Sequence, residues 1–251
     1  PLLRRQRQMC IRDSNNANVG TGKTVTISSS YSGDDVSNYS VTSQSSTTAS
    51  IVKKSLTASA TASNKTYNGD ATATTTLSFS GLVGTETLGQ SVSSTFNNKN
   101  VGTGKTVTVN SITLSDGSNG GVASNYSISS GQTTTANITA KALTVSGITA
   151  SNKTYDGNTV VTLDLTGTSY SGLVSGDDVS ISASGSFDNK NVGTGKTVNI
   201  SSSYSGSDVG NYSITDQSTT TANITASVSG ITVRGITASN KTYDGNNSAT
   251  L

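Results

Sequence analysis

Apolar and polar residues alternate along most of this chain. In residues 142–226 the alternating apolar positions are Val161, Leu163, Leu165, Val179, Ile181, Ala183, Val198 and Ile200. A period of two residues is typical of β-strands that bury one face and expose the other. Thr and Val, which favour strands, are frequent, whereas Ala, Leu and Glu do not recur at helical spacing. The pattern predicts an all-β fold.

Turn sequences divide this pattern into short segments. The turn candidates between residues 142 and 226 are Asp156-Gly157, Ser175-Gly176, Asn189-Lys190 and Ser205-Gly206. We therefore predict about seven strands in this region. They lie near residues 143–149, 159–165, 170–174, 179–184, 196–203, 211–215 and 219–226.

Three motifs recur in the chain: Lys-Thr-Tyr followed by Asp-Gly or Asn-Gly, Asn-Val-Gly-Thr-Gly-Lys-Thr-Val, and Asn-Tyr-Ser. Their copies begin at Lys65, Lys153 and Lys241; at Asn18, Asn100 and Asn191; and at Asn38, Asn125 and Asn211, respectively. Successive copies stand about 87 residues apart, which is the size of one β-sandwich domain and longer than a solenoid repeat.

This period divides the chain into segments. We expect residues 15–54 to be the C-terminal half of a repeat, 55–141 and 142–226 to be complete repeats, and 227–251 to start a further repeat. The predicted fold is a tandem array of immunoglobulin-like β-sandwich repeats, and the chain is expected to be a window on a longer protein. The incomplete repeats are expected to lack partners for their strands, among them a strand in residues 228–236.

Residues 1–14 differ from the rest of the chain. They hold its only Pro, its only Met (Met9) and its only Cys (Cys10), and residues 8–14 read like a translated sequencing adapter. We predict that this segment is non-native and leave it out of the reasoning about the fold; the alternative is a basic tail from a real upstream linker. Without its four Arg and one Asp the chain keeps 12 basic and 13 acidic residues, so the net charge of +2 says nothing about partners.

The composition excludes several classes of function. Charged residues make up 12% of the chain and no apolar run is long enough to span a membrane, so neither nucleic-acid binding nor a membrane span is predicted. The chain has no His, one Glu (Glu86), and outside residues 1–14 one Arg (Arg234) and no Cys. The chain therefore offers few groups for general acid-base catalysis, and outside residues 1–14 it has no thiol for a thiolate metal site or a disulfide. We predict that the protein is not an enzyme, with no catalytic, cofactor-binding or metal residue.

Gly-Thr-Gly-Lys-Thr resembles part of a phosphate-binding P-loop. A P-loop needs a Gly five positions before its final Gly, where this chain has Ala17, Lys99 and Lys190 in the three copies. It also needs a helix directly afterwards, and here the following residues alternate as in a strand. A hairpin turn is the favoured interpretation.

Acidic residues in Gly-rich loops offer a second candidate site. They are Asp34, Asp35, Asp116, Asp177, Asp178 and Asp208. Carboxylates are suitable ligands for calcium between repeats, but six or more oxygen ligands are needed and the spacing matches no known calcium loop. Solvated turn residues are the favoured interpretation, with calcium as the alternative.

Four ordered motifs closely resemble the YDG repeat of bacterial surface adhesins, which are similar to filamentous haemagglutinins. In one copy they are Lys153-Thr154-Tyr155-Asp156-Gly157, Gly172-Leu173-Val174-Ser175-Gly176-Asp177, residues 187–198 and Asn211-Tyr212-Ser213. The resemblance extends from Asn15 to Leu251. It implies a secreted tandem array on the surface of a Gram-negative-type cell, exported through an outer-membrane partner by two-partner secretion or as part of an autotransporter.

One repeat departs slightly from this pattern. It has Tyr67-Asn68-Gly69 in place of Tyr-Asp-Gly, and Gly84-Thr85-Glu86 in place of Ser175-Gly176-Asp177. Asn and Asp both suit a turn before Gly, so the first change is expected to preserve structure.

Two functions remain open on these grounds. The favoured one is a structural and adhesive stalk of a secreted cell-surface adhesin. In the alternative, loops 175–179 and 205–210 bind a host glycan or matrix protein, and neighbouring copies add avidity.

Overall fold

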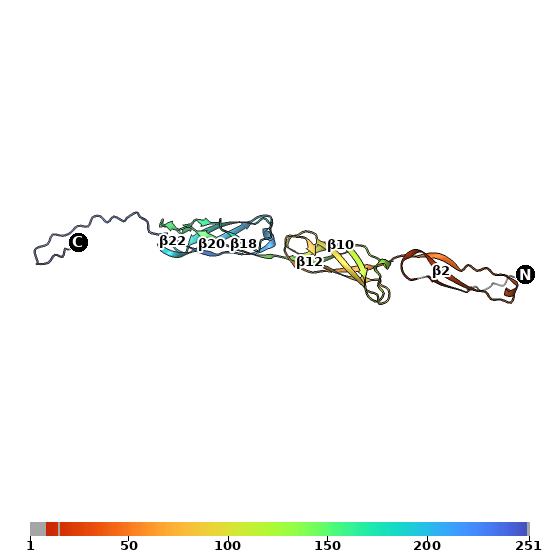
Figure 1. Ribbon diagram of the computed structural model, residues 1–251. Coiled ribbons are helices and arrows are strands. Elements are labelled where there is room, and N and C mark those ends of the chain that lie inside the picture. Colours follow the sequence, from red (N-terminus) through yellow and green to blue (C-terminus); the bar gives the residue numbers. More distant parts are fainter. Residues whose placement is uncertain (1–8, 15, 250–251) are drawn as a thin grey trace. The chain divides into compact units, whose positions relative to one another are not determined.

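The structure, a computed structural model, describes residues 9–14 and 16–249 (Figure 1). Strands dominate these residues, and the helical segments among them are the short 3-10 turns Val36–Asn38, Ala123–Asn125 and Val209–Asn211. The all-β prediction is confirmed. None of the helices in these residues is long and apolar enough to cross a membrane. The chain divides into two compact units, Pro1–Ala140 and Lys141–Leu251.

The second unit contains one five-stranded sheet and two smaller sheets. The five-stranded sheet has the order β15 (Lys153–Thr154), β22 (Thr219–Thr225), β20 (Gly193–Ser205), β19 (Ser180–Phe187) and β16 (Val160–Val161). The smaller sheets are β18 (Ser169–Ser171), β13 (Lys141–Ser146) and β21 (Tyr212–Thr215), and the pair β14 (Thr149–Ala150) and β17 (Leu163–Asp164). The pairs β13–β21 and β15–β22 are parallel, and the others are antiparallel.

The strand expected at residues 143–149 is broken at Gly147, between β13 and β14. Gly147 has φ 86°, and a Cβ there would lie 2.3 Å from the carbonyl oxygen of Gly167, so only glycine fits. The side chain of Gln217 bonds to both backbone groups of Ile148, at 2.9 and 2.7 Å. These two bonds satisfy polar groups that the break removes from strand pairing.

The strand expected at residues 159–165 changes sheets. Val160–Val161 pairs with β19, whereas Leu163–Asp164 pairs with β14. Residue 162 lies between the two, and the carbonyl oxygen of Thr162 accepts a bond from Ser151 at 3.0 Å. Apolar and polar residues keep alternating through Val161, Leu163 and Leu165, so the sequence pattern does not reveal the change of sheet.

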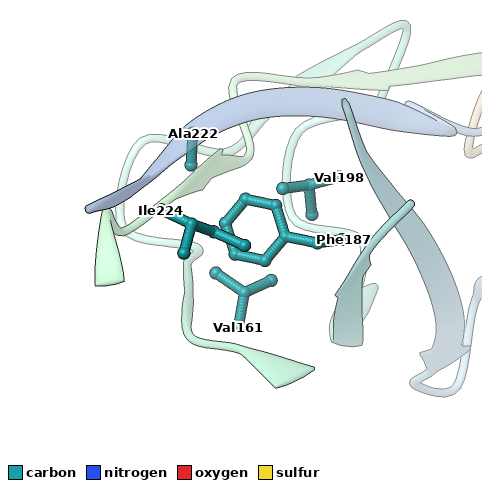
Figure 2. Close-up of a cluster of buried hydrophobic side chains, with 5 residues drawn as sticks. All are labelled: Val161, Phe187, Val198, Ala222 and Ile224. Carbon is teal, nitrogen blue, oxygen red and sulfur yellow. The ribbon is translucent and has the colours of Figure 1, made fainter. Parts of the chain in front are cut away.

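In the second unit, side chains from the five-stranded sheet and from the β14–β17 pair share a small apolar core. Phe187 and Val198, which face each other across β19 and β20, lie at its centre with Val161, Ala222 and Ile224 (Figure 2). Ala150 and Leu163 pack against this cluster from β14 and β17. Burying these side chains removes apolar surface from water, which is the main favourable contribution to folding.

The first unit contains a repeat with the same strand order. Its five-stranded sheet is β6 (Lys65–Thr66), β12 (Thr133–Thr139), β10 (Gly102–Asp116), β9 (Leu88–Phe96) and β7 (Thr72–Ala73). The other pairs are β5 (Thr57–Ala62) with β8 (Thr75–Ser80), and β4 (Lys54–Ser55) with β11 (Tyr126–Ser127). Phe96 pairs with Val107 as Phe187 pairs with Val198. The two repeats therefore share their topology and their core register.

The remaining strands of the first unit are β1 (Met9–Ser14), β2 (Gly20–Ser30) and β3 (Ser46–Ile51), in the order β1-β2-β3. The backbone of Met9–Ser14, which the strand predictions left out, pairs with β2. Residues 1–8 lie outside the described residues. An open strand edge can pair with any extended backbone, whatever its side chains are.

No strand forms in residues 226–249. The strand expected at residues 228–236 is therefore wrong, and Val228 and Ile231 are almost fully exposed. In the preceding repeat, the matching strand β13 pairs with β18 and β21. An alternating sequence forms a strand only where a partner strand is available, and in the described residues none pairs with residues 226–249.

We expect Phe187→Ala to lower the free energy of unfolding of the second unit by about 3 to 5 kcal/mol, because it removes a ring that is 2% exposed and leaves a cavity. Urea unfolding followed by circular dichroism measures this change. Val228→Ala, at a residue that is 99% exposed, is the control and should have no effect. Equal stability of the two variants would contradict the assignment of the core.

Candidate functional site

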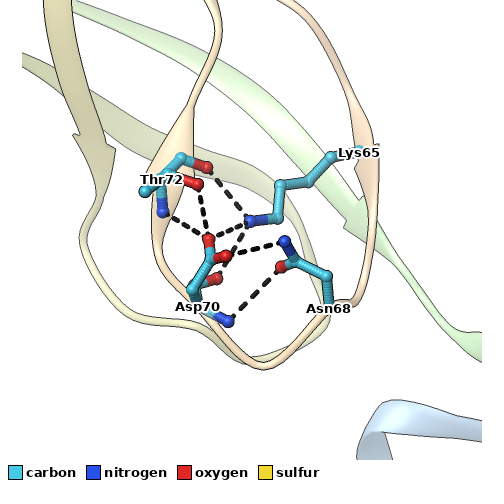
Figure 3. A network of polar contacts seen from close by, with 4 residues as sticks. All are labelled: Lys65, Asn68, Asp70 and Thr72. Atoms are coloured by element: carbon cyan, nitrogen blue, oxygen red, sulfur yellow. Dashed lines mark hydrogen bonds and ion pairs between the residues drawn. The ribbon is translucent and has the colours of Figure 1, made fainter. Parts of the chain in front are cut away.

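The Lys-Thr-Tyr-Asn-Gly turn of the first unit is closed by one lysine (Figure 3). Lys65, on β6, extends its Nζ across the loop to Asp70 Oδ1 at 2.8 Å and to the carbonyl oxygens of Asp70 and Thr72, each at 3.0 Å. Asn68 donates from Nδ2 to Asp70 Oδ2 at 2.7 Å. The loop between β6 and β7 is thus held by a single ammonium group and a carboxylate.

The same turn in the second unit exchanges the carboxylate and the amide. Lys153 Nζ lies 2.7 Å from Asp156 Oδ1 and 2.9 Å from Asn158 Oδ1, and it also bonds to the carbonyl oxygen of Val160 at 2.9 Å. Asn158 Nδ2 donates to Asp156 Oδ2 at 3.0 Å. The pair Asn68 and Asp70 of the first unit has therefore become Asp156 and Asn158. The first unit thus keeps a carboxylate in its turn, two positions further along than in the second unit.

The third copy of the turn forms without the rest of its repeat. Lys241 Nζ lies 2.8 Å from Asp244 Oδ1 and 2.7 Å from Asn246 Oδ1. Since no strand forms in residues 226–249, this turn is a local structure that its own residues specify.

The lysines keep the carboxylates of these turns ionised. The hydrogen bond from Lys153, followed by the backbone N–H of Asn158, lowers the pKa of Asp156. Lys241 lowers the pKa of Asp244 in the same way, and Lys65 with Thr72 lowers that of Asp70 further. An ionised carboxylate that is paired with lysine does not act as a general acid near neutral pH. The turn is built as an ion pair that closes a loop.

The Gly-Thr-Gly-Lys-Thr motif forms a β-bulge. The pairing register shifts between Gly193 and Lys196, and Gly195 has φ 58°. The N–H of Gly195 donates to Asn223 Oδ1 at 2.7 Å, and Gly104 bonds to Asn137 in the same way in the first unit. The amide that could have faced a phosphate is therefore occupied. The expected hairpin turn lies in the preceding residues, and the motif itself starts the strand.

The lysine of this motif folds back onto the preceding loop. Lys196 Nζ lies 2.8 Å from Asn189 Oδ1 and 3.0 Å from Asp188 Oδ1, and Lys105 Nζ lies 2.7 Å from Asn98 Oδ1. The ion pair with Lys196 lowers the pKa of Asp188. This lysine stabilises the turn between β19 and β20 rather than a nucleotide.

A pair of asparagines connects the bulge to the next strand, and the sequence reasoning missed it. Asn152 Oδ1 accepts the backbone N–H of Asn223 at 2.7 Å, while the side chain of Asn223 accepts the N–H of the bulge glycine. Asn64 and Asn137 repeat this arrangement. The signal was present, because both asparagines recur beside the lysine turn and in the last strand of each repeat.

A tyrosine on the short strand β21 holds the loop that contains Asp177. The hydroxyl of this residue, Tyr212, donates to Asp177 Oδ2 at 2.5 Å and accepts a hydrogen bond from the N–H of Val174 at 3.0 Å. In the first unit Tyr126 bonds to Glu86 and accepts the N–H of Val83. The hydrogen bond to Glu86, together with burial, raises the pKa of Tyr126. Glu86 thus replaces Asp177 as the partner of the tyrosine.

Three other candidate calcium ligands also accept hydrogen bonds from the backbone. Asp178 Oδ2 accepts the N–H of Ser207 at 3.1 Å, Asp208 Oδ2 accepts the N–H of Asp178 at 3.1 Å, and Asp116 Oδ1 accepts the N–H of Ala123 at 2.8 Å. Asp34 and Asp35 lie in the loop after β2. In residues 9–14 and 16–249, no group of three or more His, Cys, Asp or Glu is placed to hold a metal ion. The acidic residues therefore do not form a ligand shell.

A shallow groove lies over β19 and β20. Its lining residues are Ser182, Ala183, Ser184, Ser201, Ser202 and Ser203. The lining offers hydroxyl groups and no acid, base or cation, so nothing in it could activate a serine as a nucleophile.

We expect Asp156→Asn to lower the thermal midpoint of the second unit at neutral pH, because Lys153 loses the carboxylate of its turn. The double variant Asp156→Asn with Asn158→Asp should restore the midpoint, since it recreates the arrangement of Asn68 and Asp70. Calorimetry measures both variants. A double variant no more stable than the single one would show that the exchange between the two repeats is not compensatory.

The contribution of this ion pair should depend on pH. The pKa of Asp156 is lower in the folded protein than in the unfolded chain, where it is about 3.9. The pair therefore stabilises the fold above that value, and the contribution is lost as the pH falls through the folded pKa. The midpoint difference between the wild type and Asp156→Asn should be full at pH 7 and should shrink below about pH 4. A difference that stays constant to low pH would contradict the ion pair.

Tyr212→Phe should lower the free energy of unfolding of the second unit by about 1 to 3 kcal/mol, because it removes a hydroxyl that bonds to a carboxylate and to a backbone N–H. Urea unfolding measures the change. Tyr243→Phe, at a residue that is 92% exposed, is the matched control and should leave stability unchanged.

The family comparison agrees with the repeated motifs. The model of the YDG domain matches residues 52–136 and residues 139–222, which together make up more than half of the chain. No curated protein and no solved structure matches the chain. With two copies of the domain, each covering one repeat of the strand order described above, the chain belongs to the YDG domain family.

Proposed function

We propose that these YDG repeats are the structural and adhesive stalk of a secreted bacterial cell-surface adhesin, built from immunoglobulin-like β-sandwich repeats. The observation that carries this proposal is the use of the repeated polar residues. Lys153, Lys196 and Tyr212, and their counterparts in the first unit, each hold a loop of their own repeat. Motifs that recur for structure are expected in a protein whose task is mechanical.

The connections between repeats support the same function. Two residues, Val52 and Lys53, separate β3 from β4, and one residue, Ala140, separates β12 from β13. Each residue adds only two soft backbone dihedrals. Such short connections limit the freedom of successive repeats, whereas a flexible linker needs many more residues.

The extracellular location is proposed from the family resemblance and the composition. Outside residues 1–14 the chain has no Cys, so no thiol can be oxidised during export. Ser and Thr side chains line the outward positions of the strands, as in the pairs Ser182 with Ser203 and Ser184 with Ser201. We infer export by two-partner secretion or as part of an autotransporter, with an outer-membrane protein as the partner.

The alternative, binding of a host glycan or matrix protein through loops 175–179 and 205–210, has less support. Asp177 is bonded to Tyr212, and Asp178 and Asp208 are bonded to each other's loop. These carboxylates would have to leave their partners to contact a ligand. A substitution at Asp177 or Asp178 would also loosen the loops, so a loss of binding in such a variant would not identify a contact residue.

The stalk function predicts the response to force. When the full chain is pulled from both ends in single-molecule experiments, we expect two major unfolding events, one for each complete repeat. Each event should lengthen the chain by roughly 240 to 280 Å, which is the extended length of about 85 residues less a folded length of about 30 to 40 Å. A chain that extends without resistance would contradict a mechanical role.

A binding experiment separates the two functions. The full chain is applied to a glycan array and to immobilised matrix proteins, and antibodies against it are applied to intact cells that carry the gene. The stalk function predicts labelled cells and no saturable binding by the repeats. Saturable binding would support the alternative, and unlabelled intact cells would overturn the surface location.

A further inference from the structure

One contact in the first unit joins the incomplete repeat 16–51 to the complete repeat that follows it. The backbone N–H of Val19 donates to Asn125 Oδ1 at 2.8 Å, and Asn125 Nδ2 donates to Asn18 Oδ1 at 3.0 Å. The side-chain amide of Asn125 thus gives one hydrogen bond and receives another. The residues it joins are more than a hundred positions apart in the chain.

Both sides of this contact belong to repeated motifs. Asn18 and Val19 open the Asn-Val-Gly-Thr-Gly-Lys motif, and Asn125 opens Asn-Tyr-Ser. Asn125 ends a 3-10 turn directly before β11, which pairs with the first strand of its repeat. The contact therefore connects the bulge loop of one repeat with the Asn-Tyr-Ser turn of the next.

The matching loop of the second unit has the same shape. The N–H of Asn191 donates to Asn189 Oδ1 at 3.0 Å, just as the N–H of Asn18 donates to Asn16 Oδ1 at 3.0 Å. Lys196 bonds to Asn189, as Lys23 bonds to Asn16. The loop that contains residues 191–192 therefore repeats the hydrogen bonds of the loop that contains residues 18–19.

The surface around this loop is uncovered in the second unit. Val192 is 54% exposed, whereas Val19 is half-buried. Tyr155 is 39% exposed, whereas Tyr67, at the same place in the first unit, is 1% exposed. The difference in exposure between the two repeats, at both positions, marks the surface around this loop.

Tyr155 and Val192 both lie at the end of β22, where the chain leaves the repeat. The N–H of Tyr155 donates to the carbonyl oxygen of Thr225 at 2.8 Å, and Gly193, next to Val192, pairs with Ile224. The following residues start the next copy, whose Lys241 turn is already formed. A further repeat would therefore begin directly beside this surface.

We propose that Tyr155, Asn191 and Val192 form the docking site for the YDG repeat that begins in residues 227–249. In a completed copy of that repeat, the Asn at the position of Asn125 and Asn211 binds residues 191–192 as Asn125 binds residues 18–19, and the repeat covers Tyr155. This inference rests on the proposed stalk function. It adds a specific contact between successive repeats, which we call the asparagine clasp: the side-chain amide of the Asn-Tyr-Ser asparagine bonded to the first two residues of the Asn-Val-Gly motif.

The test completes the third repeat. Leu251 corresponds to Leu163, so a copy of residues 164–226 is appended to the full chain after Leu251. Hydrogen exchange of the Val192 amide is compared with that in the 251-residue chain. We expect exchange to slow by about tenfold or more, as the gain of one hydrogen bond predicts.

A matched variant separates docking from folding. The appended copy of Asn211 is replaced by Ala, and the strand amides of the appended repeat report whether it still folds. Docking predicts that Val192 returns to fast exchange while those strand amides stay protected. If the appended repeat folds and the exchange of Val192 is unchanged from that in the 251-residue chain, the proposal is overturned.

The 251-residue chain gives a second readout that does not depend on the added repeat. Asn125→Ala should speed exchange of the Val19 amide by about tenfold or more, with the amides of β10 and β12 unaffected. Protection of Val19 in this variant would overturn the clasp. If Val19 stays protected in Asn125→Ala but antibodies label intact cells, the clasp is wrong and the stalk function is still supported. Ligand binding by the repeats with an intact clasp would instead count against the stalk function alone.

Discussion

Each repeat depends on an apolar core that is small for its length. In the second unit one phenylalanine, two valines, an isoleucine and an alanine form the central cluster, with two further apolar side chains packed against it. Such a core can hold the strands that contribute to it, but it cannot order the loops that connect them. The loops therefore need another source of order, and the polar composition of the chain supplies it.

That source is a set of hydrogen bonds from side chains to backbone groups and to ion-paired partners. Lys153 closes one turn, Lys196 closes another, and Tyr212 holds a third loop. Asn152 and Asn223 continue the pairing where the bulge interrupts the ladder. Each bond contributes modestly in water, but together they satisfy backbone groups that would otherwise be left unpaired. A chain rich in Asn, Ser and Thr thereby obtains defined loops with few apolar residues.

The two repeats show which parts of this arrangement are interchangeable. The carboxylate and amide around the turn lysine exchange places, and Glu86 replaces Asp177 opposite the tyrosine. The charge and the hydrogen-bond geometry are kept while the residue positions change. Selection for geometry rather than for one reactive group is consistent with a repeat that serves as a building block, and the same asparagine chemistry extends to the contact between Asn125 and Val19.

The sequence by itself determined the class of fold, the repeat and most strand positions, because a two-residue apolar period and recurring turn residues are local signals. It also marked Asn64, Asn152 and the lysine turns by their recurrence, although not their roles. Only the tertiary structure decided which backbone groups those side chains reach, since a bond such as that between Asn152 and Asn223 joins residues 71 positions apart. It also decided that Met9–Ser14 pairs and that residues 226–249 do not. A strand exists only where a partner edge is available, and alternation within one segment carries no information about that partner.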